Sequence, residues 1–147
     1  MRTPVVGWIM ISGLNFFVNK ILPDAIVRSL SEREMAHYRE PFPTIRSRRP
    51  LRRWPCEIPI EGTPADVHQV VSAYNAWLQE TSIPMLLFHA KPGGLIREPD
   101  VAWCKEHIKN LITVDIGAGL HFVQEDNPHK IGSELAGWIE GPPGLPE

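Results

Sequence analysis

The residues best suited to chemistry lie near the end of the chain, between Gly117 and Pro128. Residues 112–116 are a short apolar run that predicts a strand, and a glycine-rich turn carrying His121 follows it. Asn127 and Pro128 then predict the start of a helix. A histidine on a strand-to-helix loop is well placed to act as a general base. A nucleophile for that base is not evident, because the chain has no nucleophile-elbow pattern.

Three further polar residues near His121, namely Glu125, Asp126 and His129, raise the question of a metal site. Their spacing matches no known ligand pattern, so no metal is expected. We expect Glu125 and Asp126 instead to favour the positive N-terminal end of the final helix.

An arginine-rich segment at residues 45–53 carries five arginines and could suggest nucleic-acid binding. No aromatic residues are interleaved there, and the chain has a net charge of −2. We therefore expect a solvated connection and no nucleic-acid partner. Gly93 and Gly94 lie outside any GxGxxG or Walker pattern, so a phosphate cradle is not expected either.

The N-terminal apolar segment, residues 5–14, imitates a signal peptide because it follows Arg2. It lacks a small-residue cleavage site and is too short to span a bilayer. We interpret it as a buried or partner-facing amphipathic segment, with no membrane partner. Cys56 and Cys104 are far apart and predict two free thiols in a reducing, cytoplasmic setting.

The first 80 residues are predicted to contain two helices. Ser31 and Glu34 have capping-box spacing and predict a helix from Glu32 to about Arg39. A second helix is predicted over 64–80, with an apolar face formed by Val67, Val70, Val71, Tyr74, Trp77 and Leu78.

The remaining pattern is strand, helix, strand, helix. Residues 85–88 predict a strand buried on both faces, and Pro99-Asp100 opens a helix to about Asn110. The last helix is expected to turn four residues inward: Ile131, Leu135, Trp138 and Ile139. This order predicts an α/β fold with a parallel sheet covered by helices.

With 147 residues and 43% apolar content, the chain has the composition of an ordinary soluble domain. Two strands alone, however, leave apolar faces and unpaired edges that need neighbours. We therefore expect the chain to be part of something larger, and an exposed sheet edge could also support self-association.

Ordered motifs from Arg2 to about Ile139 resemble the C-terminal half of haloalkane dehalogenases and of the related Renilla-type luciferases. The motifs that carry the resemblance are Asn15-Phe16-Phe17-Val18, Leu22-Pro23, Val27-Arg28, Tyr38-Arg39-Glu40-Pro41-Phe42, Arg49-Pro50, Trp54-Pro55, Ile58-Pro59-Ile60, Ile83-Pro84, Pro92-Gly93-Gly94-Leu95 and His121-Phe122-Val123-Gln124-Glu125-Asp126-Asn127-Pro128.

The resemblance implies a partial α/β-hydrolase fold: cap helices over residues 1–43, a Pro/Arg-rich connection over 44–63, the end of the main domain over 64–140, and a tail over 141–147. It implies hydrolysis of carbon–halogen bonds through an alkyl-enzyme ester, without a cofactor, on a small apolar halogenated substrate. His121 would be the catalytic general base. The implied pocket lining is Phe17, Ile21, Ala25, Leu95 and Phe122.

The other catalytic groups of that family do not map onto this chain. The nucleophilic aspartate and the principal halide donors would belong to the N-terminal half. The loop 89–94 has no carboxylate, and Asp100 is interpreted as a helix-start residue, so the acid that orients His121 would precede residue 1. The chain alone is therefore expected to be inactive. Two alternatives stay open: a fragment of a coelenterazine-type monooxygenase, and a non-catalytic truncated module.

Overall fold

The computed structural model describes residues 4–141 and divides them into two compact units. The helical unit comprises residues 4–24 and 29–76, and the sheet unit comprises Ala25–Arg28 with residues 77–141. The predicted tail falls almost wholly outside the described residues. The expected division into cap, connection and main domain stays a prediction.

The helical unit begins with α1 (Pro4–Gly7) and two π-helical segments, η1 (Trp8–Gly13) and η2 (Phe17–Ile21), followed by α2 (Leu22–Asp24). Its core contains Ile11, Val18, Leu22 and Met35, each no more than 5% exposed. Residues 5–14 are therefore partly buried, as expected for an amphipathic segment. No single helix within 4–141 is long and apolar enough to cross a bilayer; the pair Val5–Gly13 and Phe17–Asp24, bent by 68°, meets the length and composition criteria only when taken together.

Helix α3 (Glu32–Arg39) has the start that the sequence predicts. The Glu34 backbone N–H donates to Ser31 Oγ at 3.3 Å, and the Ser31 backbone N–H donates to Glu34 Oε2 at 2.7 Å. This reciprocal pair satisfies two backbone donors that the helix cannot satisfy itself, so the predicted capping box is confirmed.

The arginine-rich segment is not wholly a solvated connection. It contains α4 (Arg49–Arg53), and η3 (Trp54–Cys56) follows. The Arg48 guanidinium donates to the backbone carbonyls of Phe42, Ser12, Gly13 and Pro43 at 2.9–3.3 Å. Arg48 therefore fastens this segment to the end of η1, because five donors on one planar group can serve several carbonyls at once.

Helix α5 (Ala65–Glu80) has the predicted bounds, but none of its side chains is buried. Val70 is 68% exposed and Tyr74 56%. Of the predicted apolar face, Val67 and Leu78 are half-buried, and the other four residues remain exposed.

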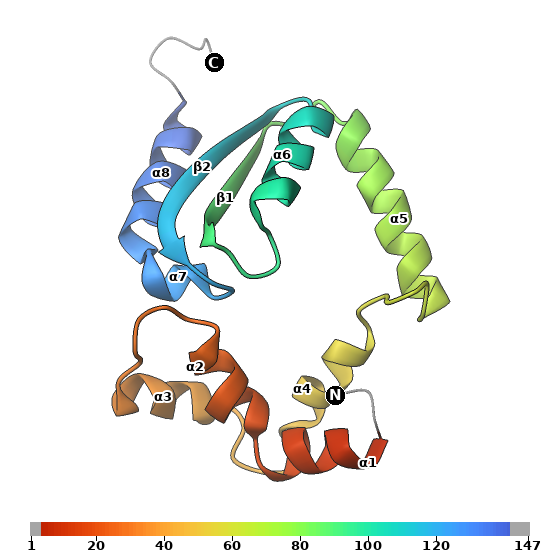
Figure 1. Cartoon of the computed structure of the whole chain (residues 1–147), viewed down its shortest axis with the longest axis vertical. Helices are drawn as coiled ribbons and strands as arrows, with labels where there is room; N and C mark the ends of the chain where they lie inside the picture. Colours follow the sequence, from red (N-terminus) through yellow and green to blue (C-terminus); the bar gives the residue numbers. More distant parts are fainter. Residues whose placement is uncertain (1–3, 142–147) are drawn as a thin grey trace. The chain divides into compact units, whose positions relative to one another are not determined.

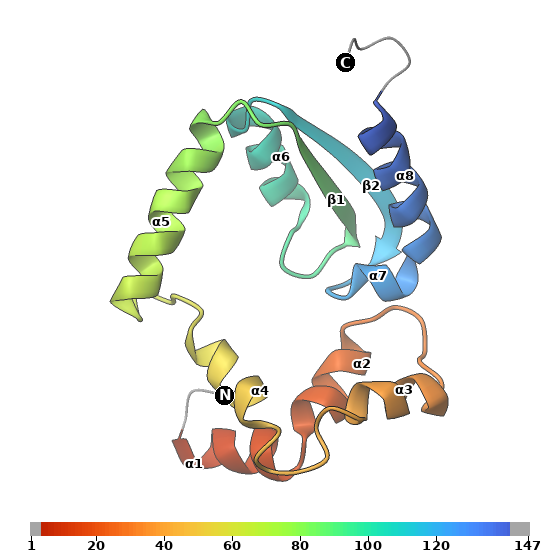
Figure 2. The ribbon, with the colours of Figure 1, turned by 180° about the vertical axis from the view of Figure 1, so that it is seen from behind.

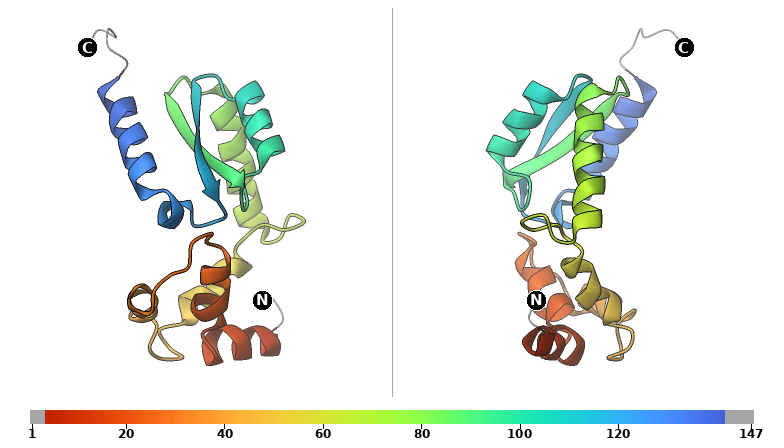
Figure 3. Two further views of the ribbon diagram at one scale, coloured as in Figure 1. Left: turned by 60° about the vertical axis from the view of Figure 1, so that its left-hand side comes forward. Right: turned by 90° about the vertical axis from the view of Figure 1, so that its right-hand side faces the viewer.

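The sheet unit contains two parallel strands, β1 (Met85–Pro92) and β2 (Leu111–Gly119), joined by α6 (Glu98–His107). Helices α6 and α8 (Pro128–Glu140) lie on opposite faces of this sheet (Figures 1 and 3). This confirms the predicted strand–helix–strand order and the partial α/β fold.

Two details of the sheet unit differ from expectation. Residues 85–88 are half-buried rather than buried on both faces, because β1 has one neighbouring strand within the described residues. In α8, Ile131 and Trp138 are half-buried, whereas Leu135 is 39% exposed and Ile139 69%. The expectation that all four face inward is wrong, because the two-stranded sheet is too narrow to cover the whole apolar face.

Candidate functional site

The strand that leads to His121 is longer than the sequence suggests. Residues 117–119 belong to β2 rather than to a turn, because Ala118 and Gly119 pair with Lys91 and Pro92 of β1. The pairing slips between His89 and Lys91, so that one residue of β1 faces two of β2. Such a bulge bends a strand near its end and redirects the side chains that follow.

The bulge is held by Asp115 and Gly117. Gly117 has φ +96°, a conformation that side chains rarely adopt, and its N–H donates to Asp115 Oδ1 at 2.8 Å. This N–H bond, aided by Lys91 at 3.4 Å, keeps the pKa of the Asp115 carboxyl below its ordinary value. The charged carboxylate therefore favours the folded bulge above the ordinary pKa, and this contribution is lost as the pH falls through the lowered one.

The backbone around His121 is anchored to a segment almost a hundred residues earlier in the sequence. The N–H groups of His121 and Phe122 both donate to the carbonyl of Ala25, at 3.0 and 3.2 Å. The Asp126 carboxylate accepts from the N–H of Val27 at 3.1 Å and from the N–H of Arg28 at 2.9 Å. We call residues 25–28 together with residues 121–126 the histidine clamp.

Arg28 completes the histidine clamp through an ion pair with Glu125, in which Nη2 and Oε2 are 2.7 Å apart. The expectation that Glu125 and Asp126 serve the start of the final helix is therefore wrong. They lie in the short helix α7 (Val123–Asp126), at the end of β2 and before α8 (Figure 2), and their carboxylates bind residues 27 and 28 instead. The Val27-Arg28 motif is visible in the sequence. That it binds Glu125 and Asp126, almost a hundred residues later, could not be inferred from sequence spacing.

Asn127 ties the start of α8 back to the strand. Its side-chain amide donates to the carbonyl of Ala118 at 2.6 Å. Together with the histidine clamp, this bond fixes both sides of the loop that carries His121.

Gly94 packs directly against His121. A Cβ at position 94 would lie 2.9 Å from the His121 Cα and 3.0 Å from its Cβ, closer than real contacts of this kind. The loop after β1 can therefore approach the histidine only because residue 94 has no side chain. The sequence places Gly94 in the Pro92-Gly93-Gly94-Leu95 motif and outside any phosphate-binding pattern, but this packing against His121 was not predicted.

The imidazole of His121 is exposed and lies edge-on to the Phe122 ring, with centroids 4.8 Å apart. Among residues 4–141, no carboxylate is hydrogen-bonded to it. It lines a pocket of about 220 Å³ in the sheet unit together with Leu95, Phe88 and Gly94.

The sheet unit thus brings together four of the six residues predicted for the site: His121, Phe122, Ala25 and Leu95. Phe17 and Ile21 belong to the helical unit, where both are half-buried on η2 and Ile21 lines a separate pocket of about 220 Å³. Their expected place in a common pocket stays a prediction.

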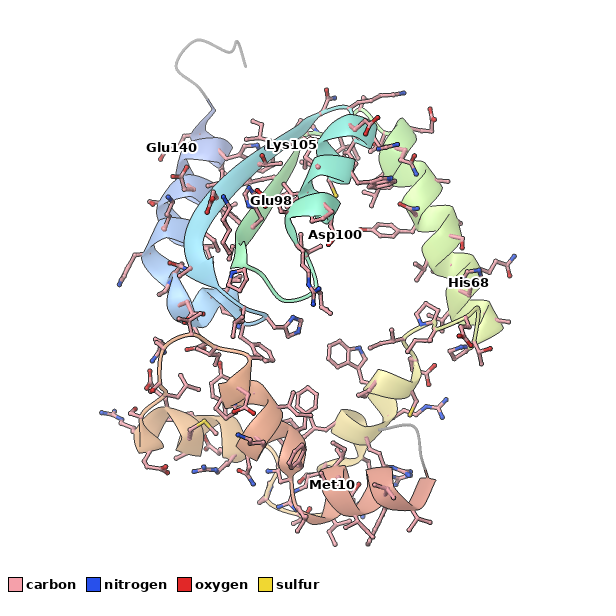
Figure 4. All side chains as sticks on the ribbon, viewed as in Figure 1. Met10, His68, Glu98, Asp100, Lys105 and Glu140 are labelled. Carbon is pink, nitrogen blue, oxygen red and sulfur yellow. The ribbon has the colours of Figure 1, made fainter. Side chains whose placement is uncertain are left out.

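The larger pocket of the sheet unit, about 800 Å³, lies between α6 and the two strands. Lys91, Arg97 and Lys105 line it together with Glu98 and Asp115; Figure 4 labels Glu98 and Lys105 along α6. Asp100 accepts the Arg97 N–H at 2.8 Å, which confirms its predicted role as a helix-start residue. Within the described part of the chain, no group of three or more metal-ligating side chains is found.

Cys104 and Cys56 are free thiols. Burial, and then the nearby Asp100 carboxylate, raise the pKa of Cys104 above its ordinary value. A raised pKa favours the thiol form over the nucleophilic thiolate.

A parallel strand pair with helices on both faces and a histidine on the loop after the second strand defines the class as an α/β-hydrolase-type segment. Comparison with known proteins specifies the family. Haloalkane dehalogenase of Bradyrhizobium diazoefficiens is 44% identical over 140 residues, which are 95% of this chain and 45% of that protein. Haloalkane dehalogenase of Sphingobium indicum is 46% identical over 130 residues, covering 85% of this chain and 42% of that protein.

Solved structures that are similar to this chain are also haloalkane dehalogenases. Haloalkane dehalogenase DbeA from Bradyrhizobium elkani matches with a TM-score of 0.93 and 46% identity, and a putative ancestral haloalkane dehalogenase matches with 0.92 and 48%. Each covers 95% of this chain and 48% of the solved chain. No family model matches the sequence.

The chain therefore belongs with the haloalkane dehalogenases and corresponds to their C-terminal half. It spans about half the length of the curated relatives it matches.

Proposed function

We propose that this chain provides the general base and part of the substrate pocket for hydrolytic dehalogenation of small haloalkanes. The observation that carries the proposal is the geometry around His121: an exposed imidazole at the edge of a pocket, on a backbone fixed by the histidine clamp. A general base needs this combination of access and fixed position.

In the proposed reaction, a carboxylate outside these 147 residues attacks the halogen-bearing carbon, forms a C–O bond and expels halide. Water then attacks the carbonyl carbon of the resulting ester while His121 takes the proton from that water. The C–O bond of the ester then breaks and the protonated His121 gives its proton to the leaving alkoxide, which departs as the alcohol. The carboxylic acid loses its proton to solvent, so the carboxylate and the neutral imidazole are regenerated. Carboxylate, imidazole and water account for every step, so the reaction needs no cofactor.

The pocket half supplied by this chain is apolar, as a haloalkane requires. Leu95 and Phe88 line the 220 Å³ pocket beside His121. Ala25, Phe122, Phe17 and Ile21 are proposed to complete the apolar lining in the whole enzyme.

The test is a fusion in which residues 1–147 follow the part of the Bradyrhizobium diazoefficiens dehalogenase that precedes its matched region. We expect this fusion to release bromide from 1,2-dibromoethane with multiple turnovers. His121→Gln should release about one bromide per chain and then stop, because ester formation does not need the base whereas ester hydrolysis does. Mass spectrometry should detect the trapped alkyl adduct.

His129→Gln in the same fusion is the matched control, since His129 is an exposed histidine at the start of α8. It should retain full turnover. Residues 1–147 alone should release no bromide above the buffer blank. Sustained turnover in His121→Gln would exclude the proposed role.

A further inference from the structure

Three arginines of the helical unit line one pocket together with a tryptophan. The pocket has a volume of about 400 Å³ and is lined by Trp8, Ser12, Ile45, Arg46, Arg49 and Arg52. Helix α4 lies beside the segment that contains η1 (Figures 1 and 2), and Arg48 fastens the two through the carbonyls of Ser12 and Gly13. Two distant stretches of sequence therefore form one surface.

The three pocket arginines have no counter-charge among the described residues. Their guanidinium groups are exposed and have no hydrogen bond or ion pair within residues 4–141, whereas Arg48 binds backbone carbonyls and Arg53 pairs with Glu57. The residues that line the pocket include no carboxylate. Like charges repel one another, so the cluster favours an anion held between them. Arginine suits phosphate oxygens, because its planar group can donate two parallel hydrogen bonds.

The same pocket also exposes apolar side chains. Trp8 is 45% exposed and Ile45 is 50% exposed. On the helical segment of Trp8, Val5 and Ile9 are exposed as well. A dissolved phosphate ion gains nothing from apolar neighbours, whereas the interface of a bilayer offers phosphate groups and acyl chains together. Tryptophan beside basic residues is typical of proteins that lie in this interface.

We propose that this surface binds bilayers that contain anionic phospholipids. We call it the arginine patch, and it comprises Trp8, Ile45, Arg46, Arg49 and Arg52. The guanidinium groups contact lipid phosphates, and the Trp8 indole lies at the level of the headgroups. Sequence analysis favoured no membrane partner because residues 5–14 are too short to span a bilayer, but a segment that lies on the surface need not span it.

Cosedimentation of residues 1–147 with lipid vesicles tests the proposal. We expect stronger binding to vesicles of phosphatidylcholine mixed with phosphatidylglycerol than to vesicles of phosphatidylcholine alone. Binding should fall at about 1 M salt, which screens the charges. Arg46→Gln, Arg49→Gln and Arg52→Gln combined should weaken binding about a hundredfold, because each basic residue near an anionic surface contributes about fivefold.

The matched control removes three exposed cations outside the arginine patch, through Arg33→Gln, Lys105→Gln and Lys130→Gln. It changes the net charge by the same amount, and its affinity for the mixed vesicles should stay about tenfold or more above that of the patch variant. Circular dichroism checks that both variants keep the helix content of the unsubstituted chain.

Tryptophan fluorescence locates the contact on the protein. Emission should shift to shorter wavelength when vesicles bind, because the indole of Trp8 leaves water. Trp8→Phe should lose most of this shift while still sedimenting with the mixed vesicles. A shift of unchanged size in Trp8→Phe would contradict the proposed position of the patch.

Membrane binding is independent of the proposed dehalogenation, because no residue of the arginine patch belongs to the predicted catalytic site. In the dehalogenase fusion, the patch variant should therefore lose vesicle binding and keep full bromide turnover. An inactive fusion that still binds mixed vesicles through the patch would contradict the proposed catalysis alone.

Equal binding to the two kinds of vesicle, or equal losses in the patch variant and its control, would overturn the membrane proposal. Binding of inorganic phosphate in calorimetry without binding to vesicles would indicate a soluble ligand instead. Retention of a DNA oligonucleotide without binding to vesicles would indicate a nucleic-acid partner. Either of these two results would also overturn the proposal.

Discussion

His121 owes its position to backbone contacts rather than to its own side chain. Its N–H is bound by the Ala25 carbonyl, and its Cα lies against Gly94, where a methyl group would not fit. Substitutions at residues that contact the His121 backbone should therefore shift the position of this histidine while leaving its side chain intact.

Gly94→Ala tests this close approach. The added Cβ would lie within 3.0 Å of three His121 atoms, two of which are backbone atoms, so one of the two loops must shift. We expect a loss of about 1–3 kcal/mol in the free energy of unfolding, measured by urea denaturation, with altered amide shifts at His121 in NMR spectra.

Gly132→Ala is the control for Gly94→Ala. A Cβ there meets nothing within 4 Å, and the position lies inside α8. Replacing this helical glycine should stabilise the chain by about 0.5–1 kcal/mol. Equal effects of the two substitutions would contradict the proposed packing.

At the scale of elements, the histidine clamp joins residues 25–28 to α7. The Asp126 carboxylate serves two backbone N–H groups, and bonds to charged groups are stronger than those between neutral ones. The capping box of α3, by contrast, is a local arrangement within four residues.

Asp126→Asn should weaken the histidine clamp while keeping its shape, since the amide oxygen can still accept one of these N–H bonds. We expect a loss of about 1–2 kcal/mol in the free energy of unfolding and faster hydrogen exchange at the Val27 and Arg28 amides. Glu134→Gln, an exposed charge removal on α8, should change neither quantity. Unchanged exchange in Asp126→Asn would show that the carboxylate does not hold the segment.

Ser31→Ala should remove the cap of α3. The Glu34 N–H then loses its side-chain acceptor, with an expected cost of about 1 kcal/mol. Thermal unfolding followed by circular dichroism measures this cost. Ser31→Thr, whose hydroxyl can accept the same N–H and can donate to Glu34 Oε2 as Ser31 Oγ does at 2.7 Å, should recover most of it, and failure to recover would argue against capping.

On the scale of the whole molecule, many large apolar side chains are exposed among the described residues. In the sheet unit alone, Trp77 and Ile112 are at least half exposed, in addition to Leu135 and Ile139. This agrees with the expectation that a two-stranded sheet needs neighbours.

Much of the local structure could be predicted from the sequence. The capping spacing at Ser31 and Glu34, the prolines at 64 and 128 and the apolar runs at 85–88 and 112–116 each depend on neighbours a few residues away, and their elements formed where predicted. The strand ends were less predictable, because the bulge at Gly117 depends on the partner strand.

By itself, the sequence determined the order of helices and strands and the parallel α/β class, because these follow from short-range spacing. Motif order also pointed to His121, whose catalytic role stays a prediction. Only the tertiary structure decided three other features. Glu125 and Asp126 bind residues 27 and 28, Gly94 contacts His121, and the side chains of Leu135 and Ile139 remain exposed among the described residues. Each of these depends on groups brought together from distant parts of the chain, or on the absence of a covering surface, and neither leaves a periodic pattern in the sequence.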